Sequence, residues 1–288
     1  MPILSERDFA MDMVLQAARD GAAAALGAPR LTPNLELQTR IVYGEEISFM
    51  VRLLEIFAGP DGVYSQFIYG DYLMGKKYME EGTPYAILLI GAKTSPSPLA
   101  WDCGACGFKT CAEFNHFARD NHSAGLFGYG PSCNWLTMDL GIALAQASAA
   151  IYAKNIDSRQ QGSYGAAGLL LGMMPGMDAV VANSVGPMTK GIFQEWYNRS
   201  DIRGNFNMNK VYDMLISTFP FHFGGFSGDG IPLIKNSDDW FWEPFKAGKG
   251  PMPEAVEILP QILEKAGEIT MEYEEWKQAR ESGKEGAK

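Results

Sequence analysis

The four cysteines of this chain constrain it more than any other feature. All of them lie between residues 103 and 133, in the pattern C-x2-C-x4-C-x21-C. Three thiols close together in sequence can wrap one face of a small inorganic cluster, and a fourth from a later segment can complete its coordination. Iron–sulfur clusters are held by four Cys thiolates in this way. We therefore predict one 4Fe-4S cluster, with these metal ligands: Cys103, Cys106, Cys111 and Cys133.

A structural zinc site is the alternative for the same four thiols. Zinc sites of this kind typically use two separated pairs of ligands, such as two C-x2-C units. Here the first three cysteines are contiguous in the sequence and include a C-x4-C step. That spacing fits an iron–sulfur cubane better than a zinc ion.

The residues between the cysteines suit an anionic cluster. Gly104 and Gly107 each follow a cysteine, and glycine allows a positive φ that brings backbone N–H groups close to sulfur. Lys109 adds a nearby positive charge, and we expect Cys111 to begin a helix whose dipole favours the cluster. Three aromatic side chains are expected to shield the cluster from water: Trp101, Phe108 and Trp135.

Composition and charge exclude several classes of partner. The chain has 288 residues, enough for one large domain or one domain with an elaboration. Its net charge of −10 argues against nucleic acid and against an anionic membrane surface. The sequence has no apolar run long enough to span a bilayer and no basic, cleavable leader, so we expect a cytoplasmic protein. Reduced cysteines fit that compartment, and an exposed cubane suggests an anaerobic host.

Hydrophobic periodicity predicts an α/β (α+β) fold with a central sheet covered by helices. The apolar segment 85–91 has no polar face, so it belongs in the middle of a sheet covered on both sides. The cysteine stretch follows directly, at a strand end where open sheets place their ligand crevices. We expect helices over 5–26, 45–57, 65–81, 136–152, 158–172 and 254–280, and strands over 35–43, 85–91 and 177–186. The expected division is an iron–sulfur domain over 1–200 and an aromatic, glycine-rich extension with a C-terminal helix over 201–288.

The candidate catalytic residues are the three histidines and one aspartate. His116 and His122 follow the cluster stretch, where an imidazole can donate protons coupled to electron transfer. His222 lies in an aromatic stretch, and 219–245 is either a lid over a substrate pocket or a packed extension. Asp139 is either a buried functional acid or a side chain that hydrogen-bonds local backbone. For the histidines, a structural role remains the alternative.

Two further cations are candidates for binding an anionic cofactor or substrate. These are Arg159 and Lys190, for which surface salt bridges are the alternative. The glycines at 162, 165 and 168 resemble a dinucleotide fingerprint. We expect them to follow a helix rather than a strand, which argues against that function.

The sequence C-G-A-C-G-F-K-T-C, followed by G-P-S-C, resembles an iron–sulfur motif of several anaerobic redox proteins. These include a corrinoid-protein subunit of acetyl-CoA decarbonylase/synthase and the B subunit of ion-pumping ferredoxin oxidoreductases. Residues 5–195 are more similar to a family of uncharacterised, ferredoxin-domain-containing proteins of anaerobes. That resemblance implies one 4Fe-4S cluster on the four cysteines and leaves the reaction open.

The order of elements is also similar to that of flavin-dependent nitroreductases. These are homodimers that hold FMN at the dimer interface, so the resemblance implies a nitroreductase-like fold and a homodimer. Their N-terminal basic motif for the FMN phosphate is missing here, because Arg7, Arg30 and Arg40 are not in matching places. The fold is therefore expected to carry over while FMN lacks a supporting motif.

Three functional hypotheses follow. The first is an oxidoreductase, or a component of one, that relays single electrons to a redox partner protein. The second is an enzyme whose cluster lies beside a flavin or small-molecule substrate pocket closed by residues 219–245. The third is a scaffold subunit that the cluster stabilises and that has no catalytic activity.

Overall fold

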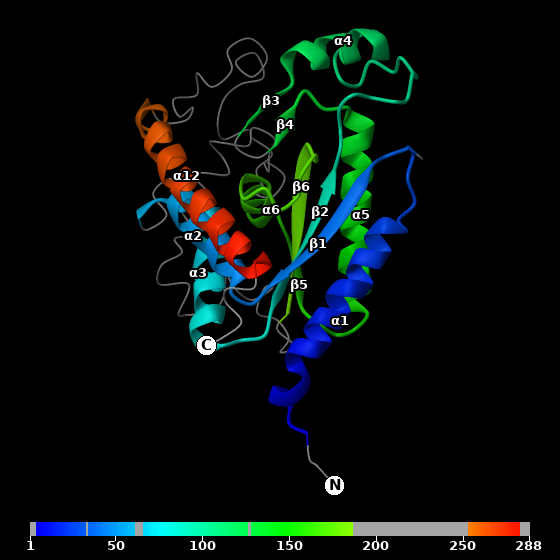
Figure 1. The fold of residues 1–288 in the computed structure, drawn as a ribbon. Helices are drawn as coiled ribbons and strands as arrows, with labels where there is room; N and C mark the ends of the chain where they lie inside the picture. Colours follow the sequence, from blue (N-terminus) through cyan, green and yellow to red (C-terminus); the bar gives the residue numbers. More distant parts are fainter. Residues whose placement is uncertain (1–3, 33, 61–65, 126–127, 187–252, 283–288) are drawn as a thin grey trace, which may run out of the picture.

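The computed structural model describes residues 4–32, 34–60, 66–125, 128–186 and 253–282. These residues form seven helices, a four-stranded sheet and a short hairpin (Figure 1). The sheet has the order β1-β2-β6-β5, and every neighbouring pair is antiparallel. Its strands are β1 (Leu37–Tyr43), β2 (Ala86–Ala92), β5 (Ser158–Gln161) and β6 (Ala179–Val185). This architecture confirms the predicted α+β class.

Strand β2 is one of the two interior strands of the sheet, as its unbroken apolar sequence predicted. All seven of its residues are buried. Successive side chains of a strand point to opposite faces. Leu88 and Ile90 accordingly belong to the core on one face, and Ile87 and Leu89 to the core on the other. A strand with a core on each side needs helices on both faces of the sheet.

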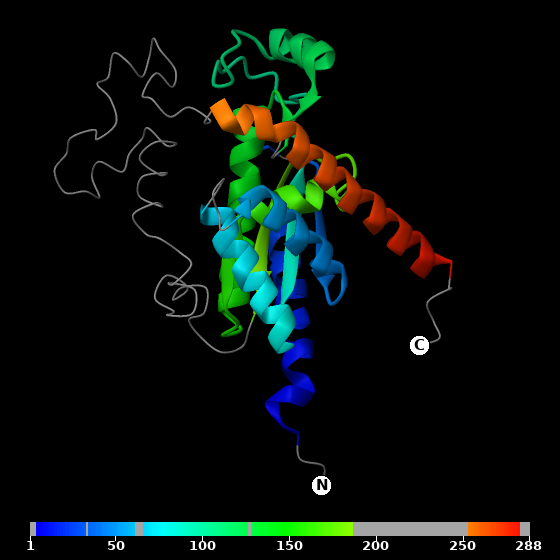
Figure 2. The same cartoon turned by 90° about the vertical axis from the view of Figure 1, so that its left-hand side faces the viewer.

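Helices cover the sheet in two layers (Figures 1 and 2). One layer is formed by α1 (Glu6–Leu26) and α5 (Asn134–Tyr152), which contact each other extensively. The other is formed by α2 (Glu46–Ala58), α3 (Gln66–Glu81), α6 (Gly162–Leu170) and α12 (Pro253–Glu281). Helix α4 (Cys111–Asn121) and the hairpin β3 (Ser123–Ala124) and β4 (Tyr129–Gly130) lie beyond one end of the sheet. That end receives the cysteine stretch.

The predicted helix over 158–172 is wrong in its first part. Residues 158–161 form the edge strand β5, and α6 begins only at Gly162. The strand reads Ser-Arg-Gln-Gln and has no β-branched residue, so propensity does not signal it. The glycines at 162, 165 and 168 therefore follow a strand, contrary to the prediction that they follow a helix. Gly165 instead lets α6 approach the sheet, since a Cβ there would lie 2.3 Å from the Val180 carbonyl oxygen.

The C-terminal helix α12 packs against α2, far from it in sequence. Tyr273 of α12 is 1% exposed and belongs to the same core as Phe49 of α2. The predicted domain boundary at 200 falls outside the described residues and stays a prediction. No helix in the described ranges is long and apolar enough to cross a membrane.

Candidate functional site

The cysteine stretch follows the end of β2, and Asp178 holds the turn between them. Its Oδ2 accepts hydrogen bonds from the backbone N–H groups of Thr94 and Ser95, at 2.7 and 2.9 Å. Asp178 precedes β6 and donates its own N–H to the Ala92 carbonyl at 2.9 Å. The carboxylate is buried, and these two hydrogen bonds stabilise its negative charge and hold the turn that follows β2. Asp178 was not among the residues predicted from the sequence.

All four cysteines line one small hollow between this turn, α4 and the start of α5. Their exposure is graded: Cys103 is exposed, Cys106 and Cys111 are half-buried, and Cys133 is 5% exposed. The hollow is therefore closed behind Cys133 and open beside Cys103. Its described lining has no carboxylate and no imidazole, so the thiols are the side chains in that lining that commonly bind iron or zinc. A set of four thiols fits an iron–sulfur cluster.

The loop has the positive φ angles that were predicted at Gly104 and Gly107. Both have positive φ, +74° and +89°, and the Gly107 N–H donates to the Gly104 carbonyl at 2.9 Å. A Cβ on Gly107 would meet no atom within 4 Å. Glycine is thus required there by the backbone conformation rather than by space. Asp102 also has positive φ, and its Oδ1 accepts from the Cys111 N–H at 2.7 Å, which closes the loop.

Helix α4 begins at Cys111, as the sequence predicted. Thr110 is its N-cap, and the hydroxyl accepts from the Glu113 N–H at 3.1 Å. The third thiol therefore lies at the positive end of a helix dipole. Lys109 donates its backbone N–H to the Glu113 carboxylate at 3.1 Å, and its side chain is exposed.

Hydrogen bonds stabilise a thiolate at Cys103. The backbone N–H of Ala105 is the main cause that lowers the pKa of the Cys103 thiol, and the Trp135 indole adds to it. The Trp135 Nε1–H donates to Cys103 Sγ at 3.1 Å. Trp101 packs edge-on against Trp135, with 6.0 Å between ring centroids. Of the predicted shielding residues, Trp135 therefore contacts the Cys103 thiol directly, and Trp101 contacts Trp135.

The fourth cysteine is held by its backbone. The Cys133 N–H donates to the Thr94 carbonyl at 2.9 Å, and Cys133 is the N-cap residue of α5. Thr94 also donates its hydroxyl to Ser132 at 2.8 Å. The turn after β2 and the start of α5 are therefore one hydrogen-bonded unit. Among the described residues, no group of three or more His, Cys, Asp or Glu side chains is gathered closely enough to hold a single metal ion.

The structure brings two of the predicted histidines into a second hollow, on another face of α4. His116 and His122 line this hollow together with Asp178, and its volume is about 560 Å³. The His122 Nε2 lies 3.1 Å from Asp178 Oδ1, and the ring stacks on Tyr129 at 5.6 Å. His222 lies outside the described residues, as does Lys190.

Asp139 holds a loop. It is fully buried, and its carboxylate accepts hydrogen bonds from the Leu31 N–H at 2.9 Å and the Thr32 N–H at 2.8 Å. The Thr32 hydroxyl donates to the same oxygen as the Thr32 N–H. Of the two roles considered for Asp139, these contacts favour the structural one, although the loop it binds is distant in sequence rather than local.

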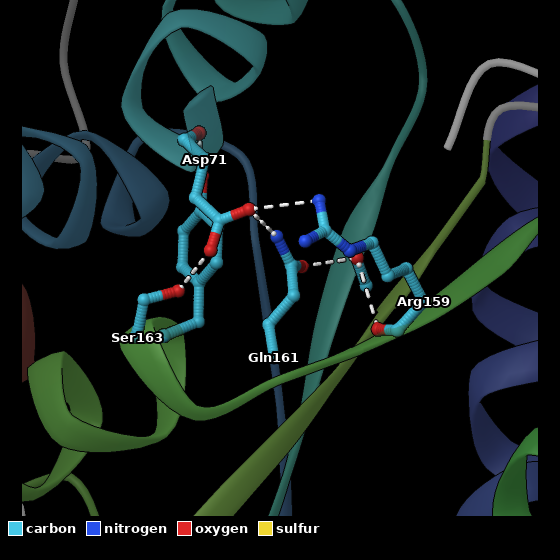
Figure 3. Close-up of polar contacts among 6 residues, drawn as sticks. Asp71, Arg159, Gln161 and Ser163 are labelled. Carbon is cyan, nitrogen blue, oxygen red and sulfur yellow. Dashed lines mark hydrogen bonds and ion pairs between the residues drawn. The ribbon is translucent and has the colours of Figure 1, made fainter. Parts of the chain in front are cut away.

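Arg159 lies at the opposite end of the sheet from the cysteines. It pairs in register with Ser184, which faces Ile87 near the start of β2. Its guanidinium lies 3.1 Å from Asp71 Oδ1 on α3. Figure 3 shows the Gln161 amide and the Ser163 hydroxyl converging on the same carboxylate. This buried network joins α3 to β5 and α6, and no sequence motif indicated it.

The four-thiol hollow at the end of a covered sheet indicates a protein of the iron–sulfur class. Residues 129–195 match the model of a family described as "uncharacterized protein containing a ferredoxin domain (DUF2148)", and this range includes Cys133. An uncharacterised protein of Archaeoglobus fulgidus is 33% identical over 173 residues, which cover 60% of this chain and 86% of that protein. The chain belongs to this family of uncharacterised proteins that contain a ferredoxin domain. No solved structure matches it significantly, so the nitroreductase-like fold stays a prediction.

Proposed function

We propose that this protein is an iron–sulfur redox protein that binds one 4Fe-4S cluster and transfers single electrons as an oxidoreductase or oxidoreductase component. The observation that carries the proposal is the convergence of all four cysteines on one hollow, with an indole N–H directed at one sulfur. The likeness of the cysteine motif to those of anaerobic redox proteins supports a role in anaerobic metabolism, and the four reduced thiols fit a cytoplasmic location.

The residues of the chain have distinct roles in this proposal. A bound cluster supplies one-electron oxidation and reduction. The Ala105 N–H and the Trp135 indole stabilise negative charge at Cys103. Trp101 packs against the Trp135 ring, while Cys133 anchors the site to α5. The open side at Cys103 is the side that a redox partner protein would approach.

Anaerobic purification followed by metal, sulfide and flavin analysis tests this function. We expect about four iron and about four sulfide per chain, with little zinc. Reduction should bleach the visible absorption and produce a cluster signal in electron paramagnetic resonance. Zinc with neither iron nor sulfide would refute the proposal and favour the structural zinc site. Released flavin would support the enzyme hypothesis and the nitroreductase-like fold. The mass of the protein in solution, measured on the same sample, tests the predicted homodimer.

Cysteine variants connect the cluster to this site. Cys111→Ser should lose most of its iron, because Cys111 is one of the four thiols. Met138→Leu, at an exposed position one turn into α5, is the matched control and should keep its iron. Iron retained in Cys111→Ser at the level of the control would show that this thiol is not a ligand. A Cys111→Ser chain that fails to fold, with no redox activity in the parent protein, would favour the scaffold hypothesis.

A further inference from the structure

The second hollow beside α4 has the volume of a small-molecule site. We call it the α4 cleft and define it by five of its lining residues: Lys93, His116, Arg119, His122 and Asp178. Its volume of about 560 Å³ falls within the range of ~300–1,000 Å³ typical of small-molecule pockets. Lys93 and Asp178 come from strand ends, and the three other residues come from α4 and its C-cap. A rigid sheet and a helix therefore position its polar groups.

The charge of the α4 cleft is opposite to that of the chain. The whole sequence has a net charge of −10, yet Lys93, Arg119 and two histidines line this hollow. Arg119 forms an ion pair with its neighbour Asp120, and both side chains are about two-thirds exposed, so that pair is weak. An Arg guanidinium can bind two oxygens of a carboxylate or phosphate at once. The exposed cationic side chains at the rim of the cleft, Lys93 and Arg119, therefore suit an oxyanion.

The acidic residue of the cleft is already engaged. Asp178 is 5% exposed, with one oxygen bound to two backbone N–H groups and the other facing His122 Nε2. A carboxylate in this position orients an imidazole and holds a proton on the nitrogen that faces it, as in catalytic triads. The other ring nitrogen, Nδ1, is then the one left for a ligand, and in the doubly protonated ring it donates a hydrogen bond to an oxyanion oxygen. Tyr129 stacks on the same ring and restricts its rotation.

We propose that the α4 cleft binds a small oxyanion, a carboxylate or phosphate group of a metabolite, with Lys93 and Arg119 as its charge partners and His122 as its oriented hydrogen-bonding partner. Helix α4 carries Cys111 and Phe114 on the cysteine hollow and His116 and Arg119 on the cleft. The ligand would thus lie across one helix from the four thiols. The binding site goes beyond the proposed function, because oxyanion binding requires no electron transfer.

Anion titrations of the full chain test the site, because the protein has only three histidines. Imidazole resonances are assigned by single His→Asn variants and followed during addition of inorganic phosphate, malonate or chloride at equal ionic strength. We expect phosphate, malonate or both to shift the resonances of His116 and His122 saturably, whereas chloride should not. A response to phosphate alone assigns a phosphate ligand, and a response to malonate alone assigns a carboxylate. If neither anion exceeds chloride, the proposal is overturned.

Charge-matched variants separate a built site from general attraction. Arg119→Ala, at an exposed position, should weaken binding of the responding anion at least tenfold by calorimetry. Lys154→Ala removes a cation that pairs with Asp20 at the far end of α5, and it should bind as the parent does. Equal weakening in both variants would overturn the site. Iron analysis of the same samples separates the outcomes, since anion binding without iron refutes only the proposed function, and iron without anion binding refutes only this site.

Discussion

At the scale of the residue, Trp135 matters through one N–H group. The cysteine pattern alone predicted the four thiols, because their spacing is encoded in sequence. The hydrogen bond from Trp135 to Cys103 could not be predicted in the same way, since residues 103 and 135 meet only after α5 is placed beside the loop. Asp178 was missed for the same reason. Its only sequence signal is a carboxylate immediately before a buried strand.

The first prediction concerns the pH at which Cys103 reacts. Because N–H donors lower the pKa of its thiol, thiolate should form at a lower pH in the folded, metal-free chain than in the unfolded chain. Alkylation of Cys103, followed by peptide mass spectrometry, should therefore reach half its maximum rate at a lower pH. Trp135→Phe should move that midpoint upward. Trp101→Phe keeps the indole donor at 135 and should leave the midpoint unchanged, and equal midpoints in the two variants would contradict the role of the indole.

The second prediction concerns Asp139. Asp139→Ala leaves two backbone N–H groups of a buried loop without their acceptor. The loss in the free energy of unfolding should be about 3 kcal/mol, measured by urea denaturation. Asp120→Ala, at an exposed carboxylate, is the control and should change stability by less than about 1 kcal/mol. An Asp139→Ala protein as stable as the parent would contradict the structural role and favour the functional-acid hypothesis for this residue.

At the scale of the element, the long periodic segments were predictable and the short polar ones were not. The predicted helix over 136–152 and strand over 85–91 match α5 and β2 to within two residues at each end. Strand β5 and the hairpin β3-β4 were missed, because a segment of four or fewer residues is too short to show a hydrophobic periodicity. Residues 158–161 form a strand because they pair with β6, and that pairing joins segments distant in sequence.

The third prediction compares two glycines in helices. A Cβ at position 165 would lie 2.3 Å from the Val180 carbonyl, so Gly165→Ala must push α6 away from β6. Gly141 on α5 is exposed and has open space around its Cβ position. In thermal or urea unfolding, Gly165→Ala should lose about 2 kcal/mol or more, while Gly141→Ala should gain up to about 1 kcal/mol. A neutral Gly165→Ala would mean that α6 does not pack this closely.

At the scale of the whole molecule, the covered sheet was predictable from one strand. An apolar β2 requires a layer on each face, and the structure has both. Which strands flank it could not be read from the sequence, because antiparallel partners are chosen by contacts between distant segments. The attachment of α12 to α2 was unpredictable for the same reason.

The fourth prediction tests that attachment. Tyr273 is buried between α12 and α2, where it packs against Phe49 and Trp276 and donates its hydroxyl to Glu46. Tyr273→Ala should cost about 3–5 kcal/mol in the free energy of unfolding of the full chain. Met271→Ala, at a position 63% exposed on the same helix, should change it little. Similar losses in the two variants would show that the helix is not docked through Tyr273.

The position of Asp178 has a consequence for how this protein can diversify. Its two oxygens serve different neighbours: one fixes the turn at Thr94, whose carbonyl accepts from the Cys133 N–H, and the other holds His122 in the α4 cleft. Lys93, His116 and Arg119 are exposed side chains that can be exchanged over evolutionary time to suit a new ligand. Residue 178 lacks that freedom, because a change made for the cleft would also disturb the thiols. Relatives of this protein should therefore vary at the rim of the cleft and keep an acidic residue at this one junction.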